Sequence, residues 1–287
     1  MKSLVIGGSS TLGSHIIKKK ELYDFTFFKK KIKNGIKFDI LSDDKKMLNV
    51  ENYNSIILLS SISNPKICEK DKTYSEKINV EATIDLIKFI SDKEKKIIFF
   101  SSEFIYDGVK GNYDELDDPN PINLYGQQKL KVEDFIRKNV ENYSILRVAK
   151  TYSNNFLENS FFSFFYSELI KKKEKEIPIV TDEFFSAIHI DDLIWVVEYS
   201  ILNNINVINT GGPLKTSRMQ CLKKFLKCNN LKGIKIKPYI RKKENNGLLI
   251  PKDVSFNVNK LREIKKNMLT IDDFLKTINE KTFNSNT

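Results

Sequence analysis

Two residues four positions apart, Tyr125 and Lys129, could form a proton-donating pair. They lie in the stretch 125–139, whose apolar spacing predicts a helix, so the two side chains face the same way. A phenol is a poor acid near neutrality because its pKa is about 10. A neighbouring ammonium favours the phenolate, and we therefore expect Lys129 to lower the pKa of Tyr125 toward the working range of a general acid.

Two further polar residues stand where they could assist this pair. Ser102 follows the apolar run 97–101, at the end of a predicted strand, and could hydrogen-bond a substrate carbonyl beside the tyrosine. Asn79 precedes the helical stretch 84–90 and could order a water molecule behind Lys129. Each residue alone is ordinary, since Tyr-x-x-x-Lys spacing is common by chance. Their joint order along the chain is what predicts a site.

A glycine-rich turn, Gly-Gly-Ser-Ser-Thr-Leu-Gly from Gly7 to Gly13, follows the first apolar run and opens a helical stretch. Small residues there let the backbone approach a pyrophosphate, and the helix N-terminus offers free N–H groups. Ser10 stands where the pattern G-x-x-G-x-x-G has its middle glycine. The turn therefore predicts dinucleotide binding, although a glycine-rich turn before any helix would look the same.

The residues after the second predicted strand, 25–28, bear on the choice of dinucleotide. An acidic side chain there would bond the ribose 2′-hydroxyl of NAD. This chain instead has Lys29, Lys30 and Lys31. Cations suit the 2′-phosphate of NADP, so we predict NADP(H) as the preferred cofactor. NAD(H) stays possible, because runs of lysine are common on the surface of so basic a chain.

The order of the predicted elements indicates an α/β fold. Five short apolar runs have the pattern of strands and alternate with helical stretches: 4–6, 25–28, 56–60, 97–101 and 145–148. This alternation predicts a doubly wound parallel Rossmann sheet whose ligands bind at the carboxyl ends of the strands. After Arg147 the rhythm becomes less regular. We expect an NADP-binding domain of residues 1–150 and 182–212, and a smaller interwoven α/β substrate-binding lobe of residues 151–181 and 213–287.

Composition argues against several other classes of protein. The chain has 287 residues, 40% hydrophobic and 30% charged, which fits a folded globular protein. No apolar run reaches the roughly 18 residues of a membrane span, and the start of the chain lacks a secretory signal pattern. Three cysteines without a Cys-x-x-Cys pair, and only two histidines, favour neither disulfides nor a metal site. We therefore expect a cytoplasmic protein with no metal and no membrane contact.

The formal net charge of +11 would suit nucleic acid as a partner. Only five of the 48 basic residues are arginine, however, and the lysines are spread along the chain. We interpret them as a scattered, solvated surface and expect no nucleic-acid partner. The acidic residues at 114, 115, 117 and 118 precede two prolines and are expected to be structural, and His189, just before a predicted helix cap at Asp191, is expected not to be catalytic.

The segment around Ser102 and Tyr125 resembles dTDP-4-dehydrorhamnose reductase and its relatives, which are extended short-chain dehydrogenases. Residues 101–108 read Ser-Ser-Glu-Phe-Ile-Tyr-Asp-Gly, similar to the family's S-T-D-Y-V-F-D-G. Matches to Y-x-E-x-D-x-P-x-P-x-N-x-Y-G-x-S-K-L-x-x-E follow in register: Tyr113, Glu115, Asp117, Pro119, Pro121, Asn123, Tyr125, Gly126, Lys129, Leu130 and Glu133. Shorter similarities extend over the whole chain, at Asp39-Ile40, Leu146-Arg147, 186–193 and 253–261.

The resemblance implies an NADPH-dependent reductase that acts on a nucleotide-linked 4-keto-6-deoxy sugar. It implies a catalytic triad of Ser102, Tyr125 and Lys129. The implied cofactor contacts come from the pyrophosphate turn and from the lining of the cleft: Gly7, Ser10, Thr11, Leu12, Gly13, Asp39, Ile40, Ser60 and Ser61. We also expect Lys29, Lys30, Asn79, Tyr125 and Lys129 beside the cofactor.

Substrate contacts are expected from Ser102, Glu103, Phe104 and Lys150. Two of these depart from the family pattern. Phe104 replaces a tyrosine that in the family lies near the sugar, and Lys150 replaces a tryptophan after L-R-x-x. Both departures lie on the substrate side, so they leave the sugar, its nucleotide and the stereochemistry of the product open.

Two other functions share parts of this pattern. A nucleotide-sugar 4-epimerase that uses NAD would have the same triad but would favour an acidic residue after the second strand. Epimerisation beside the keto group would need a further acid–base pair, often cysteine with histidine, and no cysteine falls near the expected site in the sequence. A non-catalytic NADP-binding regulatory subunit, as of methionine adenosyltransferase, would not need the intact triad. A homodimer is possible for any of these.

Overall fold

The computed structural model describes residues 2–19, 21–154, 161–241 and 248–284. Seven parallel strands form its central sheet in the order β11-β6-β5-β4-β1-β2-β3. They are β1 (Ser3–Ile6), β2 (Tyr23–Phe27), β3 (Ile36–Lys37), β4 (Ser55–Leu58), β5 (Lys96–Ser102), β6 (Tyr143–Val148) and β11 (Val207–Thr210). The strand order reverses direction between β1 and β4, which is where a doubly wound sheet binds its ligands. The predicted α/β Rossmann sheet is confirmed.

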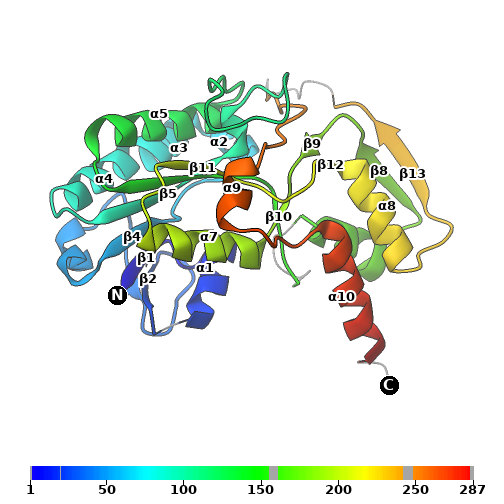
Figure 1. The fold of residues 1–287 in the computed structure, drawn as a ribbon, viewed down its shortest axis with the longest axis horizontal. Helices are drawn as coiled ribbons and strands as arrows, with labels where there is room; N and C mark the ends of the chain where they lie inside the picture. The colour runs from blue at the N-terminus through cyan, green and yellow to red at the C-terminus, as the bar shows by residue number, and fades with distance from the viewer. Residues whose placement is uncertain (1, 20, 155–160, 242–247, 285–287) are drawn as a thin grey trace.

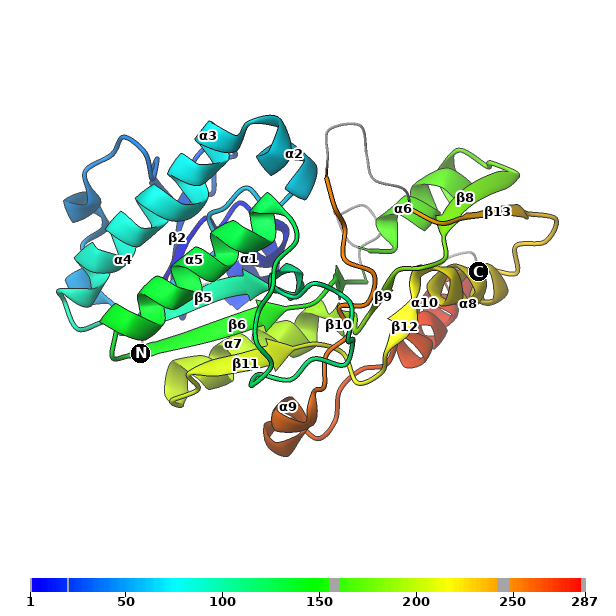
Figure 2. The same ribbon diagram turned by 90° about the horizontal axis from the view of Figure 1, so that it is seen from above.

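Helices cover both faces of this sheet (Figures 1 and 2). One face carries α2 (Pro65–Lys70), α3 (Lys72–Glu76), α4 (Thr83–Ser91) and α5 (Leu124–Asn139), with a π-helical stretch, Lys77–Ala82, between α3 and α4. The other carries α1 (Thr11–Ile16), continued by a 3₁₀ turn, Ile17–Lys19, and α7 (Ile190–Leu202). Further 3₁₀ turns are Lys45–Leu48, Val50–Asn52 and Glu103–Ile105.

The pattern of apolar strand residues explains the two layers. Neighbouring residues point to opposite faces of a strand, and both faces here are buried. Leu4 packs with Leu86 of α4 and Ile136 of α5 in one core, while Val5 packs with Ile16 of α1 and Val197 of α7 in the other. The uninterrupted apolar runs in the sequence are therefore the signature of a sheet sandwiched between helices.

A second, smaller lobe lies beside the carboxyl ends of the strands (Figure 2). It contains three small strand pairs: β8 (Glu176–Val180) with β13 (Lys235–Tyr239), β9 (Phe184–Phe185) with β12 (Thr216–Ser217), and β7 (Thr151–Tyr152) with β10 (Ile188–His189). Its helices are α6 (Ser163–Phe165), followed by a π-helical stretch, Tyr166–Lys171, then α8 (Arg218–Cys228) and α10 (Ile271–Asn284). A third core of mainly aromatic residues fills it, including Phe162, Phe185, Phe225 and Phe274.

Several local expectations differ from the structure. The predicted aromatic helix over 161–172 is a short α-helix joined to a π-helical stretch, and α9 (Asn259–Ile264) was not predicted. The cap of α7 is His189, whose side chain accepts the N–H of Asp191, and not Asp191 itself. The expected division into domains at 150, 181 and 212 stays a prediction.

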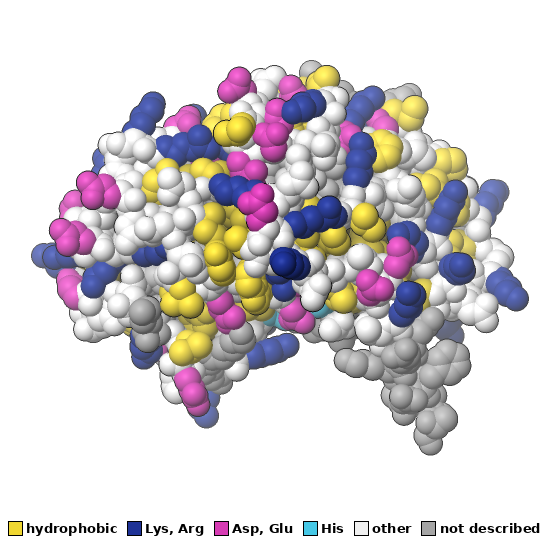
Figure 3. All heavy atoms as spheres, in the orientation of Figure 1, with side chains coloured by type: hydrophobic (Ala, Val, Ile, Leu, Met, Phe, Trp, Pro, Cys, Tyr) yellow, Lys and Arg dark blue, Asp and Glu magenta, His cyan; other side chains and the backbone are white. Residues whose placement is uncertain are grey.

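The charged side chains on the surface are scattered, as the sequence predicts. On the face shown in Figure 3, lysine and arginine side chains are interspersed with acidic ones over both lobes. Among the described residues, no helix combines the length and the apolar character that crossing a membrane would require.

Candidate functional site

A cleft of about 700 Å³ lies at the carboxyl ends of β1, β4, β5 and β6. Most of the predicted site residues line it. They are Ser10, Thr11 and Leu12 of the glycine-rich turn, Ser61 after β4, the triad Ser102, Tyr125 and Lys129, and the substrate candidates Glu103, Phe104 and Lys150. Residues far apart in the sequence are thus brought to one edge of the sheet, where parallel strands all end.

The glycine-rich turn packs closely against its neighbours in the chain. Gly7 has φ +89°, and a Cβ there would lie 2.7 Å from the Ser60 nitrogen. A Cβ on Gly13 would lie 2.3 Å from the Gly8 oxygen. Ser10 caps α1, because its Oγ accepts the Gly13 N–H at 3.1 Å. Serine in place of the middle glycine of the motif therefore stabilises the start of the helix.

The triad is assembled by the packing of α5 against the end of β5. Asn123 caps α5 by accepting the Gly126 N–H at 2.9 Å. A Cβ on Gly126 would lie 2.0 Å from the Phe104 oxygen, so only glycine permits this approach. The contact places Tyr125 beside Ser102, close enough for the Ser102 hydroxyl to act on the pKa of the phenol. The Ser102 Oγ also accepts the Phe104 N–H at 3.2 Å, which fixes its position.

Lys129 lies on the same side of α5 as Tyr125, as the spacing predicts. Its Nζ is 5.8 Å from the centre of the Tyr125 ring and donates to the Phe100 carbonyl at 2.8 Å. Burial lowers the pKa of Lys129 to about 8. The loss of hydration disfavours the charged form, and the single carbonyl does not offset it.

The predicted direction of the Tyr125 pKa is wrong for this state of the protein. Burial raises the pKa of Tyr125 above its usual value, and the hydrogen bond with Ser102 only partly opposes the rise. The residue is almost fully enclosed, with 7% of its surface exposed, so desolvation is the largest cause, and the charge of Glu103 raises the pKa further. Tyr125 therefore holds its proton, which is the form that a proton donor needs.

Asn79 precedes α4, as predicted, and is buried within the π-helical stretch that leads into it. Its Oδ1 accepts the Ile62 N–H at 2.8 Å, and its Nδ2 donates to the Ile62 carbonyl at 3.0 Å and to the Gln128 Oε1 at 2.8 Å. The asparagine thus ties the segment after β4 to α5. Its role in ordering water behind Lys129 stays a prediction. Gln128 was not predicted, and its place directly before Lys129 is a signal that could have indicated it.

The expectation that no cysteine lies near the site is wrong for Cys68. Its thiol lies 3.6 Å from the Asn79 Nδ2, and its charge would act on both Tyr125 and Lys129. Burial raises the pKa of this thiol. Cys68 is fully buried and is not among the residues that line the cleft. A protonated, enclosed thiol does not supply the additional acid–base group that epimerisation needs. Burial likewise lowers the pKa of His189, which lines no described part of the cleft.

A second cavity, of about 460 Å³, adjoins the first at Ser61 and lies where the cofactor is expected. Four more predicted cofactor residues line it: Lys29, Asp39, Ile40 and Ser60. Lys30, in contrast, is not among the described residues that line it. Phe28 and Ile62, which also line this wall, were not predicted, because single apolar residues after a strand have no distinctive pattern.

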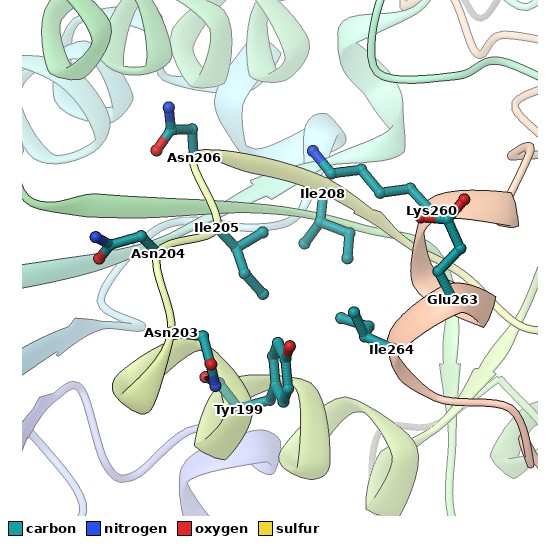
Figure 4. A pocket seen from close by; sticks show the side chains of 9 residues that line it. All are labelled: Tyr199, Asn203, Asn204, Ile205, Asn206, Ile208, Lys260, Glu263 and Ile264. Atoms are coloured by element: carbon teal, nitrogen blue, oxygen red, sulfur yellow. Dashed lines mark hydrogen bonds between the residues drawn. The ribbon is translucent and has the colours of Figure 1, made fainter.

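The acidic residues near the prolines are structural, as expected. Asp114 accepts the N–H groups of Leu116 and Asp117, and Glu115 accepts the Asn209 N–H at 2.7 Å. A separate cavity of about 650 Å³ lies between α7, β11 and α9 (Figure 4). It is next to the start of β11, at the opposite edge of the sheet from the triad, and so is not part of this site. Among the described residues, no group of His, Cys, Asp and Glu could hold a metal ion.

Comparison with curated proteins gives short matches. Methionine adenosyltransferase 2 subunit beta of Xenopus tropicalis is 33% identical over 99 residues, 34% of this chain and 30% of that protein. The probable low-salt glycan biosynthesis reductase Agl14 of Haloferax volcanii is 34% identical over 86 residues, 30% of this chain and 29% of that protein. The chain thus spans less than a third of the length of these relatives.

Solved structures match over nearly the whole fold. A hypothetical dTDP-4-dehydrorhamnose reductase from Sulfolobus tokodaii has a TM-score of 0.82 and 25% identity, and the match covers 95% of this chain and 99% of that one. The reductase from Bacillus anthracis, in complex with NADP, has a TM-score of 0.82 at 22% identity, with 98% and 100% covered. Residues 1–277 also match the RmlD substrate binding domain family. Because that match extends over almost the whole chain and the triad lies in one cleft, the protein belongs to the RmlD substrate binding domain family.

Proposed function

We propose that this protein is an NADPH-dependent reductase of a nucleotide-linked 4-keto-6-deoxy sugar. The observation that carries the proposal is the single cleft that joins the glycine-rich turn to Ser102, Tyr125 and Lys129. Cavities of about 700 and 460 Å³ that meet at Ser61 offer room for a dinucleotide and a substrate side by side. The family match and the likeness to dTDP-4-dehydrorhamnose reductases support the same reading.

The cofactor end fits NADP(H). Gly7 and Gly13 pack closely against Ser60 and Gly8, which fixes the path of the turn. Ser10, Thr11 and Leu12 of this turn line the cleft at the start of α1, where a helix N-terminus could bind a pyrophosphate. Lys29 lines the adjoining cavity and could bind a 2′-phosphate, while Asp39 and Ile40 lie on the same wall. When bound, NADPH supplies a hydride.

The triad then stabilises the negative charge that hydride addition creates on the carbonyl oxygen. Ser102 donates a hydrogen bond to the carbonyl oxygen, Tyr125 transfers its proton to that oxygen as negative charge develops, and Lys129 stabilises the resulting phenolate. These groups act more strongly on the transition state than on the neutral ketone, which is what accelerates a reaction. Glu103, Phe104 and Lys150 line the same cleft and are the proposed contacts to the sugar.

The cofactor preference is tested by titrating protein fluorescence with NADPH and NADH. We expect tighter binding of NADPH, and Lys29→Ala should weaken it by about tenfold or more, the usual effect of losing one hydrogen bond to a charged group. NADH binding should be unchanged, because NADH has no 2′-phosphate. Lys33→Ala, a surface change nearby, serves as the control. A clear preference of the parent protein for NADH would contradict this assignment.

The substrate class is tested with a panel of nucleotide-linked 4-keto-6-deoxy sugars incubated with NADPH. We expect loss of NADPH absorbance with at least one member, and formation of the corresponding 4-hydroxy sugar. If no member of the panel is reduced while NADPH still binds, the reductase assignment fails. The identity of the reduced sugar would also settle the nucleotide and the stereochemistry of the product.

A regulatory role is the second candidate, because curated relatives include methionine adenosyltransferase 2 subunit beta. Such a protein would bind NADP and hold a partner without using the triad. Pull-down with this chain followed by mass spectrometry separates the two, since only a regulatory subunit would retain a stoichiometric enzyme partner. An NAD-dependent 4-epimerase is less well supported, because Lys29 stands where an acidic residue would favour NAD. A homodimer and a cytoplasmic location stay predictions.

A further inference from the structure

Five charged side chains form a cluster where the two lobes meet at the sugar end of the cleft. Glu103 follows β5 and Lys150 follows β6, in the lobe of the large sheet. Glu183 precedes β9, Arg218 begins α8 and Arg241 follows β13, in the small lobe. Both carboxylate side chains are 4% exposed. Of these five residues, Glu103 and Lys150 line the cleft.

Lys150 stands between the two carboxylates. Its Nζ is 2.9 Å from the Glu103 Oε1 and 3.0 Å from the Glu183 Oε1, and its backbone N–H donates to the Glu103 Oε2 at 3.3 Å. The rings of Phe104 and Phe185 flank the ammonium at 5.2 and 5.0 Å. An ammonium has three N–H donors. Two are directed to the carboxylates, which leaves one donor on a side chain that forms part of the cleft wall.

Glu183 holds Lys150 in this position independently of any ligand. Its carboxylate binds Arg218 through two hydrogen bonds of 3.1 and 3.0 Å and Arg241 through one of 3.0 Å. Burying so many charges carries a desolvation cost that an apolar cluster of the same volume would avoid. The cluster is therefore costly as packing alone, and its two members that line the cleft, Glu103 and Lys150, are placed to recognise a polar group there.

The charges of Lys150 and Glu103 indicate which chemical group of the substrate would bind here. Towards the cleft, the ammonium of Lys150 is balanced by the carboxylate of Glu103, so the wall is polar but nearly neutral. A hydroxyl suits it, since it can accept from Lys150 and donate to Glu103, while an anion would be repelled by Glu103. Glu103 directly follows Ser102, which is assigned to the reacting carbonyl.

We propose that Lys150 and Glu103 are specificity-determining residues that bind the hydroxyl on the sugar carbon next to the reacting carbonyl. The proposal rests on the reductase function proposed above. In a 4-keto-6-deoxy sugar this group is the 3-hydroxyl. Lys150 donates to its oxygen, and Glu103 accepts its proton in a hydrogen bond.

Two nucleotide-linked 4-keto-6-deoxy sugars that differ only in the presence of the 3-hydroxyl test this. For the parent protein, kcat/KM should fall by about 10²-fold when the hydroxyl is missing, because buried polar groups are left unpaired. For the double variant Lys150→Met/Glu103→Gln, the two sugars should differ by less than about threefold. This variant removes one charge of each sign and leaves Glu183 paired with its arginines. The matched control is Lys172→Met/Glu168→Gln, which removes an exposed ion pair of 2.9 Å.

The outcomes separate the two proposals. Discrimination by the parent and the control but not by the double variant supports the assignment, and undiminished discrimination by the folded double variant overturns it. If the double variant does not fold, Glu103→Gln alone should lower the discrimination. If the parent reduces neither sugar, the reductase function fails. Calorimetry with the two sugars then decides the present proposal, because equal affinities of the parent for both overturn it.

Discussion

We expect the replacement of Tyr125 with phenylalanine to lower kcat by about 10²-fold or more, the range of general acid catalysis, and to leave the affinity for NADPH little changed. The substitution keeps the ring and its edge-to-face contact with Phe104, whose centre is 6.3 Å away. It removes the phenolic proton that we propose is transferred to the substrate oxygen beside Ser102. Because burial raises the pKa of Tyr125, the parent phenol is fully protonated near neutrality, and it can transfer its proton only as negative charge develops on the substrate oxygen.

Single-turnover reduction of the keto sugar at saturating NADPH measures this effect without interference from product release. Tyr239→Phe, at a half-exposed position on β13 in the small lobe, is the control and should keep the parental rate. A folded Tyr125→Phe protein that reduces the sugar at the parental rate would show that another group donates the proton.

Replacing Arg147 with methionine lowers the free energy of unfolding by about 3–5 kcal/mol, the range found when one partner of a buried ion pair is removed. Arg147 is fully buried. Its Nη2 is 2.9 Å from the Glu133 Oε2, and its Nη1 donates to the Tyr106 hydroxyl at 2.7 Å. Methionine fills much of the space but leaves the carboxylate of Glu133 buried with too few donors.

Urea unfolding of both proteins, followed by circular dichroism, gives the difference. The chain provides a matched control, because Arg137 binds the same Glu133 at 3.2 Å from a side chain that is 37% exposed. Arg137→Met should cost less than about 1 kcal/mol, since the Arg137 side chain is partly solvated and Glu133 keeps its buried partner Arg147. Equal losses for the two variants would contradict the account, and the further change Glu133→Gln should recover part of the stability lost in Arg147→Met.

The Arg147 pair also shows what a motif in the sequence can predict. Leu146-Arg147 and Glu133 were recognised as matches to a family pattern, but nothing in the sequence indicates that the two charges meet inside the protein. Several other matched residues are structural too. Tyr113 stacks on Tyr106 with ring centres 4.2 Å apart, and Asp117 pairs with Lys110. Residues that match the family motif therefore include structural residues as well as catalytic ones.

The strands of the large sheet could be predicted because both faces of each are buried, so their apolar runs are uninterrupted. The strands of the small lobe could not, since several contain only two residues and have no periodicity. The triad and the turn were found from local spacing. The rise of the Tyr125 pKa and the position of Cys68 beside Asn79 depend on burial and on tertiary packing, which spacing does not report.

Dependence on tertiary packing also explains why the ion pairs of Lys150 could not be predicted. Its place in the sequence marked it as a departure on the substrate side, but its two carboxylate partners come from different lobes. No pattern in the sequence links Glu183 to it. The ion pairs that define the sugar end of the cleft could be found only in the folded chain.

Transfer of deuterium tests the central claim most directly. The protein is incubated with NADPH deuterated at the transferable position and with the keto sugar that it reduces best, and the product is examined by mass spectrometry and NMR. The account predicts one deuterium on the carbon of the former carbonyl, and a strong loss of labelled product with Tyr125→Phe. Binding of NADPH and sugar without any labelled product would contradict it.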